Sequence, residues 1–394
     1  MRPYKTVVRF SDRIDVSEPN PIARGEREAK MQGRSLVKLN DSNPTSHGLA
    51  PQVLPTRYLA QPRGQETARE QLAQVIGCPD PSRLYLLSST SQAYAWLMAL
   101  LCDPGDAVLA PKPGYPLIES IAQFSGVNVE TYHLRFDGSW TMDVAQIERM
   151  LADDAHGDSK IKALIVINPN NPTGQYVKPE ERERIVELCR RYDIAIIADE
   201  VFFDYALEPF EGNRRFAGER QVLTFALDGF SKRLAAPHAK VGWIEVSGPS
   251  QDVEEAQRRL EVIADDFLPM SEFIAERMPD MLAELNTQHD LVQQRISRNL
   301  DSLHAMLEAD DLGVVNVLRA EGGWNVLLRM PSFIDENDFV TYLINQYGYT
   351  GQPGYFFDME SNGYLAISLL PEPEQFDENV RVVLEAVRHF VDEI

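Results

Sequence analysis

Hydrophobic and polar positions alternate along the middle of the chain in a pattern that predicts a large α/β domain. From about residue 83 to residue 246, short apolar or β-branched runs alternate with longer segments of helical periodicity. This alternation is typical of a mostly parallel sheet covered by helices. The segment 179–192 predicts one such helix, because it begins with a proline, carries its acids early and carries its arginines late. We expect a seven-stranded sheet, with strands at 83–87, 107–110, 127–131, 161–167, 194–198, 222–227 and 241–246.

The pattern changes after residue 248 and predicts a smaller α+β domain. The first 45 residues have little periodicity and contain Pro19, Pro21 and Pro44, so we expect them to run along the surface and join this domain. The predicted division is a large domain at 46–285 and a small domain formed by 1–45 and 286–394. Helices are expected at 251–264, 271–307, 335–346 and 374–391, and strands at 314–318, 324–329 and 364–369.

Composition narrows the class of protein. The chain has 394 residues, of which 44% are hydrophobic, enough to bury a substantial core. Its 38 Lys+Arg and 60 Asp+Glu give a net charge of -22, which works against nucleic acid or anionic membranes as partners, although solubility alone explains the charge. The first ten residues do not have the pattern of a signal peptide, so we expect a cytoplasmic protein. Three widely spaced cysteines predict neither disulfides nor a metal site.

Three polar residues follow buried strands of the predicted sheet. Asn171 lies in the turn-rich segment 168–174, Asp199 ends an apolar run, and Lys232 follows the run 222–227. In open parallel sheets, ligands bind outside the carboxyl ends of the strands. An amide, a carboxylate and an amine at this edge are the groups needed to hold an aromatic aldehyde cofactor. We interpret them as a site for pyridoxal 5'-phosphate.

Each of these residues also has a simpler interpretation. A buried Asp199 could be a helix cap or loop anchor, although an unpaired buried carboxylate is costly and a protonated pyridine nitrogen would pair with it. Asn171 could belong to an ordinary Asn-Pro turn. Most lysines are solvated, yet Lys232 directly follows a buried strand, where a desolvated amine could form a Schiff base.

Further candidates would hold the rest of the cofactor. Ser88, Ser89 and Thr90 precede a helix expected at 92–102, so backbone N–H groups and hydroxyls could bind the phosphate, with Lys240 as a cation. Helix capping explains the same serines equally well. Two more side chains complete the cofactor set: Tyr115, which could stack on a flat ring or simply be a core or surface tyrosine, and Ser231, the neighbour of Lys232.

Together these motifs resemble the class I/II aminotransferases of the aspartate aminotransferase superfamily, the fold-type I pyridoxal-phosphate enzymes. The resemblance spans nearly the whole chain and includes the order of the residues above and Pro353-Gly354. It implies amino transfer between an amino acid and a 2-oxo acid, with Lys232 and Asp199 as catalytic residues. Tyr58 resembles the family tyrosine that reaches the phosphate of the neighbouring subunit, which implies a homodimer with shared active sites.

Five positions depart from the family pattern. Ser42 stands where a glycine is usual, Phe202 where a tyrosine is usual, Gly229 where a serine is common, and Lys240 where an arginine is usual. Ala366 stands where most members carry the arginine that binds the substrate carboxylate.

The position of Ala366 leaves the substrate open, because another group must bind a carboxylate there or the substrate must differ. Candidate substrate-binding residues are Asn43, Arg24, His47 and Arg57, from segments expected to border the cleft. Two alternatives to amino transfer stay open. One is another fold-type I reaction, β-elimination or oxidation, and the other is a non-catalytic aminotransferase-like binding protein.

Overall fold

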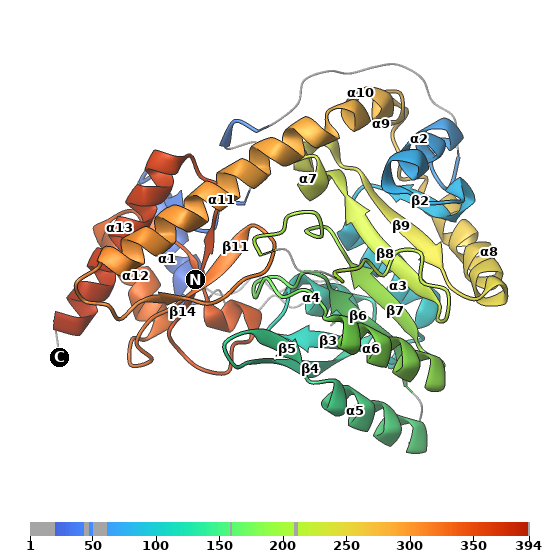
Figure 1. Cartoon of the computed structure of the whole chain (residues 1–394), viewed down its shortest axis with the longest axis horizontal. Coiled ribbons are helices and arrows are strands. Elements are labelled where there is room, and N and C mark those ends of the chain that lie inside the picture. The colour runs from blue at the N-terminus through green and yellow to red at the C-terminus, as the bar shows by residue number, and fades with distance from the viewer. Residues whose placement is uncertain (1–19, 43–46, 50–60, 158–159, 209–211, 393–394) are drawn as a thin grey trace, which may run out of the picture.

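The structure is built around one large sheet that is covered by helices (Figure 1). The computed structural model describes residues 20–42, 47–49, 61–157, 160–208 and 212–392. Five central strands run parallel, and β9 runs antiparallel to both of its neighbours, β2 and β8. In spatial order the strands are β2 (Leu84–Leu87), β9 (Gly242–Ser247), β8 (Thr224–Gly229), β7 (Ala195–Asp199), β6 (Ile161–Ile167), β3 (Ala107–Lys112), β4 (Asn128–Phe136) and β5 (Trp140–Met142).

The mostly parallel sheet is confirmed, but the predicted count of seven strands is wrong. All seven predicted strands are present, and the eighth is β5, which forms an antiparallel hairpin with β4. This strand has three residues, of which Trp140 and Met142 are buried and Thr141 is exposed. A single alternation over three residues is too short to be recognised as strand periodicity in a sequence.

Apolar side chains pack on both faces of the sheet, which explains why its strands read as continuous apolar runs. On one face, α3, α4 and α8 contribute buried residues such as Trp96, Ile121 and Leu260. On the other face, α5 and α6 contribute Leu151 and Ile185. The predicted helix at 179–192 is confirmed as α6, which ends one residue earlier. The helices of this part are α2 (Glu66–Ile76), α3 (Thr90–Leu101), α4 (Leu117–Phe124), α5 (Val144–His156), α6 (Pro179–Arg191), α7 (Phe230–Arg233) and α8 (Ser250–Phe267), with single 3-10 turns η2 (Pro81–Arg83) and η3 (Pro237–Ala239).

The stretch expected to be one helix over 271–307 is divided into three. These are α9 (Glu272–Ala275), α10 (Met278–Ala283) and α11 (Leu285–Ala309). Pro279 lies in the first turn of α10, where its missing N–H costs no helical hydrogen bond. The long α11 runs from the large sheet to the smaller one and connects the two parts of the molecule (Figure 1).

The second sheet has four short antiparallel strands in the order β10-β11-β14-β13. Helices α12 and α13 supply much of the apolar core beneath it, including Phe339 and Val383. The bounds are β10 (Asn316–Val317), β11 (Asn325–Arg329), β13 (Gln352–Pro353), β14 (Tyr364–Ser368), α12 (Glu336–Gln346), the 3-10 turn η4 (Gly354–Phe357) and α13 (Pro373–Asp392).

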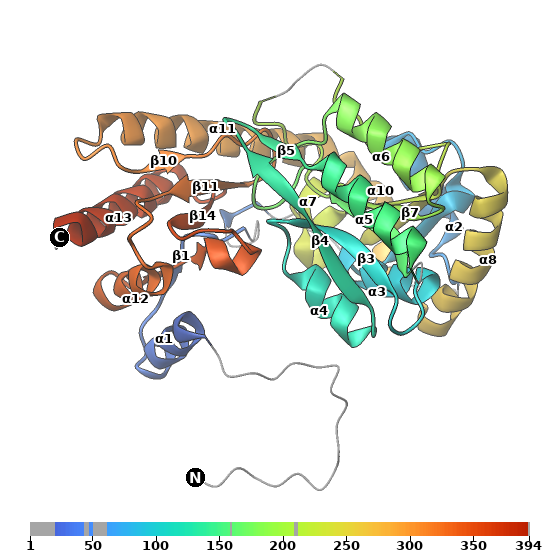
Figure 2. The same cartoon turned by 90° about the horizontal axis from the view of Figure 1, so that it is seen from below.

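The N-terminal segment contains a helix that the sequence analysis missed. Helix α1 (Pro21–Met31) starts with the Asn20 side chain accepting a hydrogen bond from the backbone N–H of Ala23. It packs beside α12 (Figure 2), and β1 (Val37–Lys38) pairs in parallel with β12 (Tyr349–Thr350). The described part of the first 45 residues therefore contacts the C-terminal part of the chain.

Two kinds of feature are absent from the described ranges. None of their helices is long and apolar enough to cross a membrane. Nor do their His, Cys, Asp and Glu side chains form a group of three suited to a metal ion.

Candidate active site

One pocket of about 420 Å³ lies where the carboxyl ends of the central strands meet the smaller sheet. Its lining contains most of the residues singled out in the sequence, so strand ends far apart in the chain do converge. It also contains Ser91, which the sequence analysis did not single out. The predicted residues that line it are Ser89, Thr90, Tyr115, Asn171, Asp199, Ser231, Lys232 and Lys240.

Lys232 lies in the short helix α7, directly after β8. Its Nζ is 5.2 Å from the ring centroid of Phe202 and 5.0 Å from that of Trp324. Burial lowers the pKa of Lys232 to about 8, although the carboxylate of Asp199 opposes the shift. Near neutral pH this amine is still mainly protonated, but it loses its proton far more readily than a solvated lysine does, as a nucleophilic amine requires. The Tyr205 hydroxyl donates to the backbone carbonyl of Lys232 at 2.8 Å and holds this segment.

Asp199 ends β7 and is 5% exposed. Its Oδ2 accepts a hydrogen bond from the hydroxyl of Tyr94 at 3.0 Å, and its Oδ1 accepts one from the backbone N–H of Val201 at 3.3 Å. Burial raises the pKa of Asp199 to about 6, and these two donors oppose the rise. A protonated pyridine nitrogen would complete the charge balance of this carboxylate. Tyr94 was missed because nothing in the sequence indicates that α3 presents it to β7.

The start of α3 forms an anion-binding corner. Ser89 caps the helix by accepting from the N–H of Gln92 at 3.2 Å, which leaves other first-turn N–H groups for a ligand. Gly242 of β9 lets the strand approach, since a Cβ there would lie 3.1 Å from the backbone of Ser89. Lys240 lines the same pocket. The corner has the donors and the charge that a phosphate group requires.

Ser88 is not among the pocket residues. Its hydroxyl and its backbone N–H both donate to Oε1 of Gln92, at 2.8 Å and 3.0 Å. The helix-start interpretation therefore describes Ser88 better than phosphate binding does, and Ser91 lies in the pocket instead.

Asn171 and Tyr115 approach the pocket from loops. Asn171 Oδ1 accepts from Asn325 Nδ2 at 3.2 Å. Gly174 has the positive φ expected from its turn, 70°, and an added Cβ there would lie 2.6 Å from Ala320 Cβ. Tyr115, 38% exposed, lines the pocket, where its ring could cover a flat ligand.

The side of the pocket next to the smaller sheet carries neutral polar groups. Ser42 donates to Asn325 Oδ1 at 2.9 Å, and its hydroxyl lies 3.2 Å from that of Ser368. Ala366, two residues before Ser368 in β14, is 2% exposed and belongs to an apolar cluster with Leu327 and Phe357. The position where the resemblance implies a guanidinium is therefore occupied by apolar packing.

Two of the candidates for substrate binding lie outside the pocket lining. Arg24 is exposed on α1, and neither Arg24 nor His47 is part of the pocket lining. The His47 ring lies 3.0 Å from the backbone carbonyl of Asp41 through its Nε2. The expectation that Arg24 and His47 border the cleft is therefore not supported by their positions. Asn43, Arg57 and Tyr58 lie outside the described residues.

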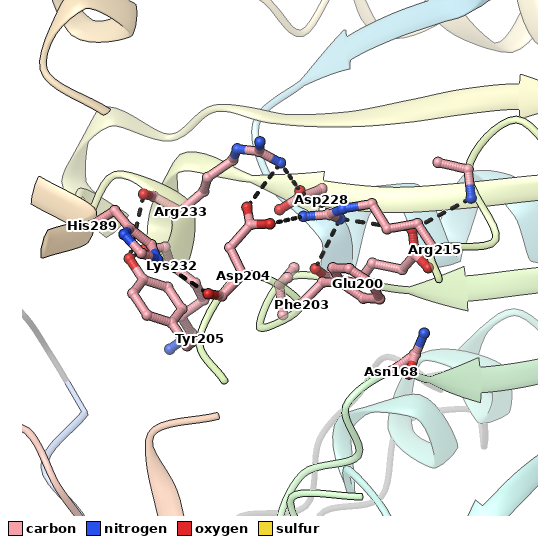
Figure 3. Close-up of polar contacts among 12 residues, drawn as sticks. Asn168, Glu200, Phe203, Asp204, Tyr205, Arg215, Asp228, Lys232, Arg233 and His289 are labelled. Atoms are coloured by element: carbon pink, nitrogen blue, oxygen red, sulfur yellow. Dashed lines mark hydrogen bonds and ion pairs between the residues drawn. The ribbon is translucent and has the colours of Figure 1, made fainter. Parts of the chain in front are cut away.

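A group of charged side chains lies behind Lys232, and we call it the buried ion network (Figure 3). The guanidinium groups of Arg215 and Arg233 both pair with the carboxylates of Asp204 and Asp228, at distances from 2.9 to 3.2 Å. Asp228 precedes Gly229 and Arg233 follows Lys232, so the network anchors the chain on both sides of the lysine. Its members are Glu200, Asp204, Arg215, Asp228 and Arg233.

Comparison with known proteins agrees with this geometry. The family model described as aminotransferase class I and II matches residues 56–383. Tyrosine aminotransferase of Dictyostelium discoideum is 25% identical over 297 residues, covering 72% of this chain and 70% of that protein. Tyrosine aminotransferase of Homo sapiens is 30% identical over 182 residues, covering 45% of this chain and 39% of that protein. The chain thus spans well under half of the human relative's length.

Solved structures show the same fold. Alanine aminotransferase from Pyrococcus furiosus superposes with a TM-score of 0.83 at 20% identity, covering 97% of this chain and 100% of that one. An aspartate aminotransferase mutant from Thermus thermophilus gives a TM-score of 0.77 at 22% identity, covering 97% and 99% of the two chains. The family match covers most of the chain, and therefore this protein belongs to the class I and II aminotransferases, the pyridoxal-phosphate-dependent enzymes of fold type I.

Proposed function

We propose that this protein is an aminotransferase that moves an amino group between an amino acid and a 2-oxo acid in two half-reactions. The observation that carries the proposal is the meeting of Lys232 and Asp199 in one pocket, with opposite pKa shifts caused by burial. Among the described residues, no cation is bonded to the Asp199 carboxylate. This carboxylate and a partly neutral amine are the two groups that pyridoxal phosphate needs at its opposite ends.

The pocket residues fit the cofactor in chemistry. First-turn N–H groups of α3, the hydroxyls of Ser89, Thr90 and Ser91, and the ammonium of Lys240 would hold its phosphate. Asp199 would hold its ring nitrogen. The remaining groups are Asn171 for the phenolate oxygen, Tyr115 for the ring face, and Ser231 beside the lysine.

Pyridoxal phosphate supplies, when bound, an aldehyde that captures amines and a ring that withdraws electrons from the substrate's α-carbon. Lys232 Nζ would hold the cofactor at rest and, once displaced by a substrate amine, would accept the α-proton. The aromatic rings of Phe202 and Trp324 keep water from this nitrogen, which maintains its lowered pKa. Asp199 stabilises positive charge on the ring nitrogen.

Assembly and location belong to the same proposal. A homodimer with shared active sites, in which Tyr58 reaches the neighbouring phosphate, follows from the family resemblance alone. A cytoplasmic location follows from the sequence alone.

The test is to replace Lys232 with alanine. We expect the purified variant to lose the absorbance of covalently attached cofactor and turnover to fall by about 1000-fold, because the proton-transfer group is gone. Lys30→Ala, at an exposed lysine of α1, serves as the control and should retain both. The measurements are the absorbance spectrum and 2-oxo acid production over a panel of amino acids.

Three outcomes would contradict the proposal. An unchanged spectrum in Lys232→Ala would refute the role of the lysine. Pyruvate and ammonia released without an acceptor 2-oxo acid would favour β-elimination. A wild-type protein that binds no cofactor would favour a non-catalytic binding protein.

A further inference from the structure

One side of the pocket is formed by uncharged amides and a hydroxyl, and we call it the neutral wall. Its residues come from the N-terminal segment, the loop after β6 and the smaller sheet, and Ser368 lies behind it. All residues of the neutral wall line the same pocket as Lys232, whereas Ser368 does not. The neutral wall consists of Asn40, Ser42, Asn171, Asn325 and Gln352.

Within the described lining of the pocket, the cations are Lys232 and Lys240. Both have partners in the proposed function, because Lys232 would hold the cofactor and Lys240 would pair with its phosphate. Ala366 adds no charge, since it packs against Leu327 in the neighbouring strand. The described part of the neutral wall therefore offers a ligand hydrogen bonds without a balancing charge.

Asn325 is the best-placed donor of the neutral wall. Its Oδ1 accepts from Ser42 at 2.9 Å, and one N–H of its Nδ2 donates to Asn171 Oδ1 at 3.2 Å. An amide nitrogen carries two N–H groups, and the second has no partner among the described residues. Asn325 also sits in a regular strand, where it pairs with Ser368 in β14. Its amide is therefore fixed in orientation and keeps one donor for a ligand.

The bond between the two amides also bears on Asn171. Because Asn171 uses its oxygen to accept from Asn325, its Nδ2 is directed elsewhere and can serve the cofactor. In the proposed function the Asn171 nitrogen would then donate to the cofactor, and the second N–H of Asn325 would be left for another ligand.

We propose that Asn325 binds the substrate's carboxyl group through an uncharged hydrogen bond, so that the enzyme accepts the neutral carboxamides of amino acids about as well as the amino acids. This inference rests on the proposed function, because it assigns the substrate end of the same pocket. An amide N–H can donate to a carboxylate oxygen or to a carboxamide oxygen, and the stronger bond to the charged oxygen is offset by the larger cost of removing a carboxylate from water. A guanidinium would instead favour the charged ligand strongly, since its charge is complementary.

The experiment uses two ligands that carry no amine and cannot react, phenylpropanoate and phenylpropanamide. Their dissociation constants for the wild-type holoenzyme are measured by isothermal titration calorimetry. We expect the two constants to agree within about tenfold, the size of one neutral hydrogen bond. Because neither ligand is a substrate, the result does not depend on whether amino transfer occurs.

The decisive variant is Asn325→Asp, which keeps the shape and adds a negative charge. Binding of phenylpropanoate should weaken by about 100-fold or more, because like charges meet, while binding of phenylpropanamide should change by about tenfold or less. Asn316→Asp is the matched control: it makes the same change in the same sheet at an exposed position of β10. It should leave both constants unchanged.

A second variant, Asn325→Leu, removes the donor without adding charge and should weaken both ligands equally, by about tenfold. It carries the test if Asn325→Asp no longer folds or binds the cofactor, which the absorbance spectrum reports. The inference is overturned if wild-type enzyme prefers phenylpropanoate by about 100-fold, the signature of a cation. It is also overturned if the wild type binds neither ligand, or if Asn325→Asp weakens both ligands to the same degree.

Discussion

The two sides of the pocket are built on different physical principles. Behind Lys232, the buried ion network joins three carboxylates and two guanidinium groups at distances down to 2.9 Å. The neutral wall instead uses amide and hydroxyl groups, with hydrogen bonds of 2.9 to 3.3 Å. Removal of one charged group from the buried ion network leaves the remaining charges buried without a partner. Removal of one group from the neutral wall leaves only an unsatisfied hydrogen bond.

This difference predicts which side tolerates change. The buried ion network fixes the backbone on either side of Lys232, so we expect it to support the part of the reaction that is the same for every substrate. The neutral wall is the part of the pocket that we propose binds the substrate, so we expect the loss of a hydrogen-bonding group there to alter selectivity at small cost in stability. Variants on the two sides should therefore differ in both the size and the kind of their effects.

The largest effect is expected for Arg215→Met. Arg215 lies between Glu200, Asp204 and Asp228, so its loss leaves three carboxylates with Arg233 alone. We expect the free energy of unfolding to fall by about 3–5 kcal/mol, the usual cost of breaking a buried ion pair. Denaturant unfolding of the holoenzyme measures it. Arg258→Met, at an exposed arginine paired with Glu255, is the control and should cost less than about 1 kcal/mol.

The pH dependence of this loss has a definite sign. Burial raises the pKa of Glu200 to about 7, and Arg215 opposes that rise. A carboxyl with a raised folded-state pKa destabilises the protein as pH rises through that pKa, because the folded state must then hold a buried charge. Without Arg215 the cost of burying the charged carboxylate grows. The loss in the free energy of unfolding caused by Arg215→Met should therefore be larger at pH 8 than at pH 6. A deficit independent of pH would mean that Arg215 contributes mainly by packing on Phe203.

The sequence predicted that Asp199 and Lys232 would lie in one pocket, but it did not predict the side chains that support them. Asp199 and Lys232 could be found because each follows a buried apolar strand, and strand ends of a parallel sheet share an edge. The buried ion network could not be found, because Arg215 lies in a loop and Asp204 in a turn with no periodic signal. Tyr94 was missed for a related reason: its contact with Asp199 joins residues 105 positions apart.

For the fold as well, long sequence patterns could be predicted and short or long-range features could not. The long apolar strands and the capped helix α6 were predicted, because their patterns extend over many residues. The short β5 and the division at Pro279 depend on a few residues each and were not. On the neutral side, Asn325 appeared only as part of an expected strand, since its hydrogen bonds to Ser42 and Asn171 link three distant segments.

An intermediate effect is expected for Tyr94→Phe, which removes the side-chain donor to Asp199. A donor to a carboxylate favours its charged form, so the loss should raise the pKa of Asp199 further above its present value of about 6. We expect the pH below which apoenzyme loses affinity for pyridoxal phosphate to rise by about one unit, the value of one hydrogen bond. Cofactor binding measured by fluorescence across pH 5 to 8 tests this.

Tyr132→Phe is the matched control for this change. Tyr132 is also fully buried, but its hydroxyl donates to the carbonyl of Ile165. It should lose stability without moving the pH profile. If Tyr94→Phe lowers affinity equally at every pH, Tyr94 acts through packing and the proposed link to the charge of Asp199 is wrong.

The smallest effect is expected on the neutral side, for Ser368→Ala. Its hydroxyl lies 3.2 Å from that of Ser42 and accepts from the N–H of Leu370 at 3.2 Å. Ser42 keeps its bond to Asn325, so the free energy of unfolding should fall by only about 1 kcal/mol. Ser247→Ala is the control: both serines are 1% exposed, but the Ser247 hydroxyl has no partner in the described chain and its loss should cost less. If Ser368→Ala destabilised the protein as much as Arg215→Met, the neutral wall would be as tightly coupled as the network, and the contrast between the two sides would fail.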